Sequence, residues 1–189
     1  LLYRQPVDNR NKDGGNKVLD DIDRELNAIQ NARSKTKTAE DWIKISGRLM
    51  ALDNRLNNVV DKKEYTVEEA TACRLLVKRS ALARDIAGEL LSFRGNEEVL
   101  KYIRAEADTM LVGFLKEQVA QAKTKQAKAD DTLDKARIYL NEWLDPKNNI
   151  PEYIIQGIYR GMLESRSADI LYCFGFGWRE FGTAGIRNP

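Results

Sequence analysis

Apolar residues recur every three or four positions along most of this chain, which is the spacing of a helix with one buried face. No proline lies between Pro6 and Pro146, so long helices are unobstructed over that length. We predict an all-α fold, an antiparallel bundle or extended array of five to six amphipathic helices. An extended arm over residues 1–16 is expected to precede a helical domain over residues 17–164.

The individual apolar stripes predict where each helix lies. Residues 17–34 carry the stripe Val18, Leu19, Ile22, Leu26 and Ile29. Residues 39–60 carry a heptad seam typical of bundles and coiled coils, formed by Trp42, Ile45, Leu49, Leu52, Leu56 and Val59. Further helices are predicted over residues 67–93, from residue 97 onward, over residues 133–144 and from Pro151. Thr38 and Asn96 have the side chains and positions of helix N-caps.

Residues 120–131 differ from the helices around them because they lack large apolar side chains. Their Ala, Gln and Lys residues keep a high helix propensity. We therefore expect an exposed helical stretch or a helical hinge there.

From residue 165 the composition changes, and residues 171–189 are rich in glycine and aromatic residues, a composition unlike that of the bundle helices before them. A buried aromatic side chain stabilises a fold by about 2 kcal/mol or more, whereas an exposed aromatic cluster promotes aggregation. The tail over residues 165–189 is therefore expected either to complete the chain's own core or to dock on a partner. The predicted partner-docking residues are Tyr172, Phe174, Phe176, Trp178 and Phe181.

Charge and the absence of histidine narrow the function classes. Lys and Arg number 31 against 29 Asp and Glu, so the chain lacks the basic excess of most nucleic-acid-binding domains. A helical nucleic-acid packaging factor stays an alternative because basic residues cluster between residues 74 and 84. With no histidine, Ser-His and Cys-His nucleophile systems and His-ligated zinc sites are excluded within this chain. We predict no catalytic residue, no cofactor and no metal site.

The cysteines and the chain start bear on the compartment. Cys73 and Cys173 form no CxxC pair and are expected to be small buried residues, with a single bridge between them as the alternative. No apolar run approaches the roughly 18–20 residues that span a bilayer. The chain begins with Leu1 rather than Met, which favours an intracellular, mitochondrial protein whose transit peptide was removed; a removed tag and a partial chain are the alternatives.

The segment Glu180-Phe181-Gly182-Thr183-Ala184-Gly185-Ile186-Arg187 resembles the N-terminal signature of the α-D-phosphohexomutase family, which includes phosphoglucomutase and phosphomannomutase. Trp143-Leu144 matches the Trp-Leu pair that the family carries upstream of it. The resemblance implies that Arg187 contacts a substrate phosphate. It is confined to residues 143–189, and the family's phosphoserine loop and Asp-Gly magnesium loop have no counterpart here. An N-terminal fragment of such an enzyme is therefore an alternative function.

The interpretation that accounts for most of the chain is a non-enzymatic helical subunit that scaffolds or assembles a larger protein complex. Its partners would be other protein subunits, with no small-molecule substrate. An accessory subunit of an organellar respiratory or ATP synthase assembly is the expected setting.

Overall fold

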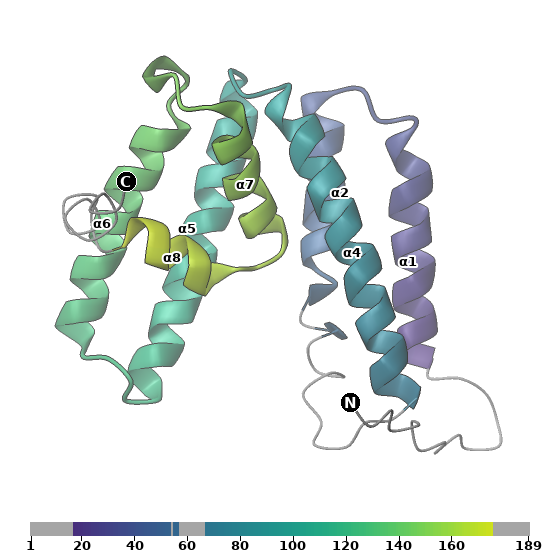
Figure 1. Cartoon of the computed structure of the whole chain (residues 1–189), viewed down its shortest axis with the longest axis horizontal. Helices are drawn as coiled ribbons and strands as arrows, with labels where there is room; N and C mark the ends of the chain where they lie inside the picture. Colours follow the sequence, from purple (N-terminus) through teal and green to yellow (C-terminus); the bar gives the residue numbers. More distant parts are fainter. Residues whose placement is uncertain (1–16, 54, 57–66, 176–189) are drawn as a thin grey trace, which may run out of the picture. The chain divides into compact units, whose positions relative to one another are not determined.

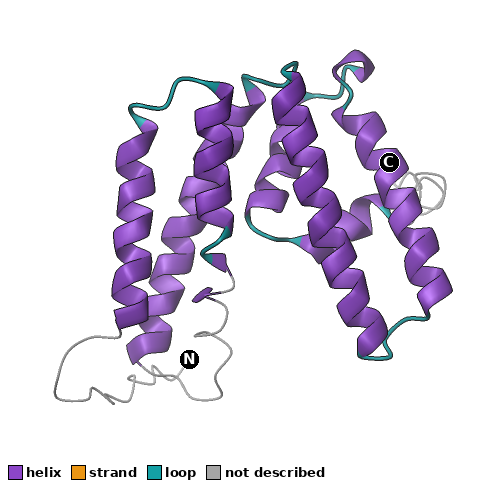
Figure 2. Ribbon diagram, turned by 180° about the vertical axis from the view of Figure 1, so that it is seen from behind, coloured by secondary structure: helices purple, strands orange, loops and turns teal. Residues whose placement is uncertain are grey.

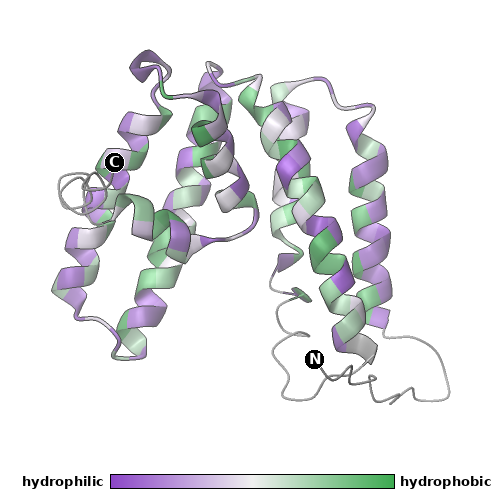
Figure 3. Ribbon diagram, viewed as in Figure 1, coloured by the Kyte–Doolittle hydropathy of each residue, from purple (hydrophilic) through white to green (hydrophobic). Residues whose placement is uncertain are grey.

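The computed structural model describes residues 17–53, 55–56 and 67–175 (Figure 1). Over those residues the chain is helical and contains no strand (Figure 2), which confirms the all-α prediction. Polar and apolar residues alternate along the helices, as expected for amphipathic elements (Figure 3). The helices are α1 (Lys17–Arg33), α2 (Ala39–Met50), α4 (Val67–Leu91), α5 (Glu97–Ala120), α6 (Gln126–Leu144), the 3-10 helix η1 (Pro146–Asn148), α7 (Glu152–Leu163) and α8 (Ser167–Phe174).

The chain divides into two compact units, residues 1–86 and residues 87–189, and the boundary falls within α4. The helical domain expected from the sequence, residues 17–164, thus includes parts of both units. The predicted start of the tail, residue 165, falls inside the second unit.

The first unit packs α1 and α2 with the N-terminal part of α4. Four residues of the predicted α1 stripe are buried: Leu19, Ile22, Leu26 and Ile29. Val18 was also predicted to be part of the stripe, but its side chain is 45% exposed because it lies one position away from the buried face. Ion pairs join the helices: Lys78 of α4 contacts Asp23 of α1 at 2.6 Å.

The heptad seam of the first unit is buried from Trp42 to Leu56, although α2 itself ends at Met50. The Leu52 N–H donates to the Leu49 carbonyl in the turn that follows. The prediction of one helix over residues 39–60 is therefore wrong at Met50, because a turn can keep the next apolar side chains in the core. Val59 lies outside the described residues. Thr38 caps α2 as predicted, accepting the Asp41 N–H at 3.2 Å.

The second unit is built on α5 and α6, which pack side by side (Figures 1 and 2). Asn96 caps α5 as predicted by accepting the Val99 N–H at 3.2 Å. Between the helices the backbone turns, with Ala122 in the left-handed region at φ 55°. Residues 120–131 are thus a tight connection followed by the first turns of α6, and not one exposed helical stretch. The sequence placed the start of this helix at residue 133 because its first buried residues, Ala129 and Thr132, are small.

Helices α7 and α8 cover α5 and α6, and α8 contacts all three of the other helices. It is largely apolar (Figure 3) and buries Ile170, Leu171 and Phe174, which lie on one helical face. The expectation that residues from 171 onward are unlike the helical part is therefore wrong as far as Phe174. The dense aromatic composition obscured a short amphipathic pattern.

Candidate functional site

An apolar groove lies where α6, α7 and α8 meet in the second unit. It is a cavity of about 270 Å³. Its apolar lining comes from all three helices: Trp143, Ile154, Ile158, Ile170 and Phe174. A concave apolar surface of this kind is typical of a binding site.

One wall of the groove is an aromatic pair. The rings of Trp143 on α6 and Phe174 on α8 meet edge to face, with centroids 5.5 Å apart and planes at 79°. Phe174 is 6% exposed, whereas Trp143 is half-buried. Edge-to-face packing adds about 0.5–1.5 kcal/mol to the burial of the rings. The pair therefore holds α8 against α6 and gives the groove a rigid wall.

Two glycines one helical turn apart on α7 leave room for the groove. A Cβ added at Gly161 would meet the Ile170 side chain at 3.5 Å, so α7 and α8 approach each other closely there. A Cβ added at Gly157 would meet nothing within 4 Å, so the helix surface is open at that position. Because glycine has no side chain, Gly157 leaves the groove open at this position, and a larger residue there would fill it.

The rim of the groove is charged and carries a thiol. Arg166 donates from Nε to Asp169 Oδ2 at 2.7 Å, and both residues line the groove. Cys173 lies beside them, and partial burial of its thiol raises the thiol's pKa, with a further increase from Asp169 and a smaller opposing effect of Arg166. Both this cysteine and Cys73 are free and exposed, so the prediction that they are buried is wrong.

Two of the helices that form the groove also carry exposed tyrosines, which do not line it. Tyr153 is 74% exposed and lies one turn before Gly157 on α7. Tyr172 is 60% exposed and precedes Cys173 on α8. Tyrosine is enriched at protein interfaces because its ring supplies apolar area and its hydroxyl tolerates water.

The predicted docking residues that the structure describes lie in different environments. Tyr172 is exposed on α8 and precedes the groove residue Cys173, while Phe174 is buried and lines the groove. For Phe174 the structure favours a place in the chain's own core. Phe176, Trp178 and Phe181 lie outside the described residues, as does Arg187.

Sequence reasoning missed the rest of the groove, including Trp143, Ile158 and Gly157 as lining residues. The one local signal was the pair of glycines spaced by four residues in the predicted helix from Pro151. That spacing places them on one face of a helix, where they make a shallow surface.

Within the described ranges, no three Cys, Asp or Glu side chains are grouped so that they could hold a metal ion. None of the described helices is both long and apolar enough to cross a bilayer. Comparisons with protein-family models, with curated proteins and with solved structures found no match to this chain. Function is therefore inferred from the geometry of the groove.

Proposed function

We propose that this chain is a non-enzymatic helical subunit that joins a larger protein complex through the apolar groove of α6, α7 and α8. The observation that carries the proposal is the open apolar hollow of about 270 Å³ on a helical unit, with exposed tyrosines on two of its helices. Grooves between helices are a common receptor for an amphipathic segment of a partner.

The groove defines the chemistry of that segment. Its lining would accept one or two large apolar side chains, and each would contribute about 1.5–3 kcal/mol when it is fully buried. The Arg166–Asp169 pair at the rim offers a cation and a carboxylate to polar groups that flank those side chains. The expected partner is therefore an amphipathic helix whose apolar stripe ends in charged residues.

An accessory role in an organellar assembly, such as a respiratory or ATP synthase complex, is the setting we propose for this binding. In such an assembly the chain would supply packing surface, and the chemistry would belong to other subunits.

The nucleic-acid alternative has less support because basic residues of the cluster between residues 74 and 84 form ion pairs with carboxylates of the first unit. Lys78 pairs with Asp23 at 2.6 Å, and Arg79 is buried against Asp53 at 3.3 Å. The mutase alternative depends on Arg187, which lies outside the described residues. Sequencing the natural reading frame beyond Pro189 would test it directly, since that alternative requires a long α/β continuation.

The decisive experiment fills the groove without disturbing the fold. Gly157→Met places a long apolar side chain in the hollow, where an added Cβ meets nothing within 4 Å. The matched control is Gly113→Met on α5, which is exposed, equally unobstructed and outside the groove. Each variant would be expressed as a tagged full chain in its native cells, and its native mass would be measured.

We expect the wild-type chain and the Gly113→Met control to migrate in an assembly far larger than 21.6 kDa. Gly157→Met should migrate alone while keeping its helical circular dichroism. Migration of the wild type as a monomer would contradict the proposed function, and an intact assembly with Gly157→Met would exclude the groove as its docking site.

A further inference from the structure

Tyr159 of α7 has a buried hydroxyl whose hydrogen-bonding capacity is unused. The residue is fully buried, and its Oη has no hydrogen-bond partner in the part of the chain that the structure describes. A buried polar group left without a partner costs about 1–3 kcal/mol, so such a group calls for an explanation. Burial raises the pKa of this phenol, and the nearby charges of Arg94 and Arg104 act in the opposite direction.

The two arginines beside this hydroxyl also have unused donors. Arg94 donates from Nη1 to the Ile150 carbonyl at 2.8 Å, but its Nε and Nη2 are buried without a partner. The Nε of Arg104 is buried and unpartnered as well. The charges of both arginines act on the Tyr159 hydroxyl, and each of the three side chains has a buried donor that no acceptor among the described residues receives.

A buried Nε without a hydrogen-bond partner also occurs at Arg33, so what distinguishes Arg94 and Arg104 among the buried and half-buried arginines that the structure describes is the lack of a described carboxylate nearby. Among the described residues, three other arginines are buried or half-buried, and each has a carboxylate close to it. The pairs are Arg33–Asp85 at 2.8 Å, Arg79–Asp53 at 3.3 Å and Arg160–Glu164 at 3.2 Å. Neither Arg94 nor Arg104 has a described carboxylate within ion-pair distance. A charge that is partly buried without a counter-charge costs free energy, so an anion near these two guanidinium groups would stabilise them.

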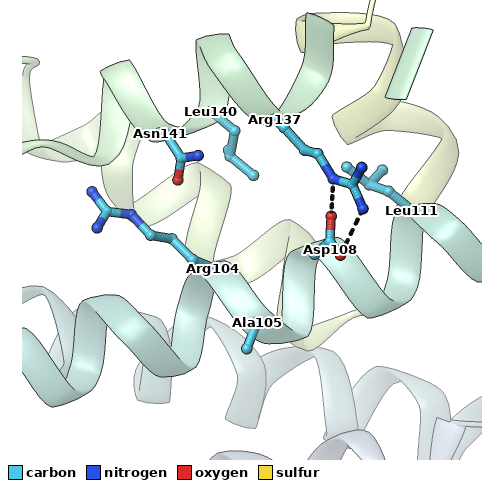
Figure 4. A pocket seen from close by; sticks show the side chains of 7 residues that line it. All are labelled: Arg104, Ala105, Asp108, Leu111, Arg137, Leu140 and Asn141. Carbon is cyan, nitrogen blue, oxygen red and sulfur yellow. Dashed lines mark hydrogen bonds and ion pairs between the residues drawn. The ribbon is translucent and has the colours of Figure 1, made fainter. Parts of the chain in front are cut away.

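A second groove gives Arg104 access to solvent. This cavity of about 290 Å³ lies between α5 and α6 and is lined by Arg104, Asn141 and the apolar Leu111 and Leu140, among others. In Figure 4 the Arg104 side chain is directed toward the end of the groove where Asn141 lies.

Asp108, the carboxylate that lines the same groove, already forms an ion pair with Arg137. Asp108 accepts from Arg137 Nη2 at 3.0 Å and also from its Nε (Figure 4). That bidentate pair leaves Arg104 as the unpaired charge of the groove.

We propose that Arg104, supported by Arg94 and the Tyr159 hydroxyl, forms a site for a phosphate group that enters through the groove between α5 and α6. A phosphate supplies several acceptor oxygens and negative charge, and the planar fork of a guanidinium matches its geometry. The Asn141 amide on the facing helix can donate as well. The phosphate belongs either to a free ion or to a small phosphomonoester.

The site is tested by calorimetric titration of the full chain with inorganic phosphate and with glycerol phosphate, at constant ionic strength set by chloride. Arg104→Met removes the charge and keeps an apolar side chain, and Tyr159→Phe removes only the hydroxyl. The charge-matched control is Lys116→Met, an exposed residue of α5 that does not line the groove.

We expect saturable binding to the wild type and to Lys116→Met, and about tenfold or greater loss of affinity in Arg104→Met, the usual effect of losing a charged hydrogen bond. Tyr159→Phe should bind several-fold more weakly. Tighter binding of glycerol phosphate would identify a phosphomonoester ligand, and binding of inorganic phosphate alone a free ion. Absence of saturable heat with both compounds, or unchanged affinity in Arg104→Met, would overturn the site. Neither result depends on the docking groove of α6, α7 and α8.

Discussion

Replacing Phe174 by alanine should destabilise the second unit substantially. The ring is 6% exposed and contacts Trp143 edge to face at 5.5 Å. Phe→Ala changes in cores cost about 3–5 kcal/mol, part of which comes from the cavity left behind. Here the vacated space joins the open groove, so the cavity contribution is smaller and we expect a loss of about 3 kcal/mol.

That loss translates into a large shift of the melting temperature. For a domain of roughly 60–100 residues each kcal/mol shifts the midpoint by about 4–8 °C, so the expected decrease is about 12–24 °C. The assay is thermal and urea unfolding followed by far-ultraviolet circular dichroism. Any transition belonging to the first unit should keep its midpoint, because Phe174 lies in the second unit.

The matched control is Tyr172→Ala on the same helix. Tyr172 is 60% exposed, so its replacement should change stability by no more than about 0.5 kcal/mol. If Phe174→Ala unfolded at the same temperature as Tyr172→Ala, Phe174 would not be packed and α8 would not belong to the core.

Three further predictions concern a buried charge, two phenols and a thiol. Asp53→Ala should cost about 3–5 kcal/mol in urea unfolding because it removes the carboxylate from the buried Arg79, and a loss below 1 kcal/mol would contradict this role. Burial raises the pKa of Tyr102 and Tyr159, so above about pH 10 the unfolded chain loses phenolic protons that the folded chain keeps, and stability should fall with rising pH. Absorbance at 295 nm should show these two phenols ionising late, and Phe substitution of either should remove one late step. In a Cys73→Ser variant, a bulky maleimide on Cys173 should block the proposed assembly because this thiol lines the groove of α6, α7 and α8. A Cys173→Ser variant labelled at Cys73 should still assemble.

The spacing of apolar residues along the chain predicted which segments are helical and which of their faces are buried. The residues of the α1 stripe, such as Ile22 and Ile29, are buried where their spacing predicted. Thr38 and Asn96 cap α2 and α5 as predicted, because a cap needs only its own side chain and the next turn of backbone. These features depend on neighbours within one or two helical turns.

The residues at which α2 ends and α6 begins could be located only in the folded structure. The end of α2 at Met50 is a turn that leaves Leu52 buried, so the apolar period continues across it. The start of α6 at Gln126 is stabilised by small residues such as Ala129, which carry little apolar signal by themselves. A periodicity of large side chains detects neither limit, because it continues past the end of α2 and begins only after the start of α6.

The sequence alone thus determined that the described part of the chain is all-α, which faces of its helices are buried and that two helices begin at polar caps. Each of these properties depends on residues within a few positions of one another. The tertiary structure decided which surfaces converge. The groove of α6, α7 and α8 combines Trp143, Gly157 and Cys173 from three helices, and no local pattern relates them. Likewise Arg94 and Arg104 resemble every other arginine in the sequence, and only the folded chain shows that no described carboxylate comes near them. Burial and charge pairing depend on distances across the fold, whereas helical periodicity depends only on distances along the chain.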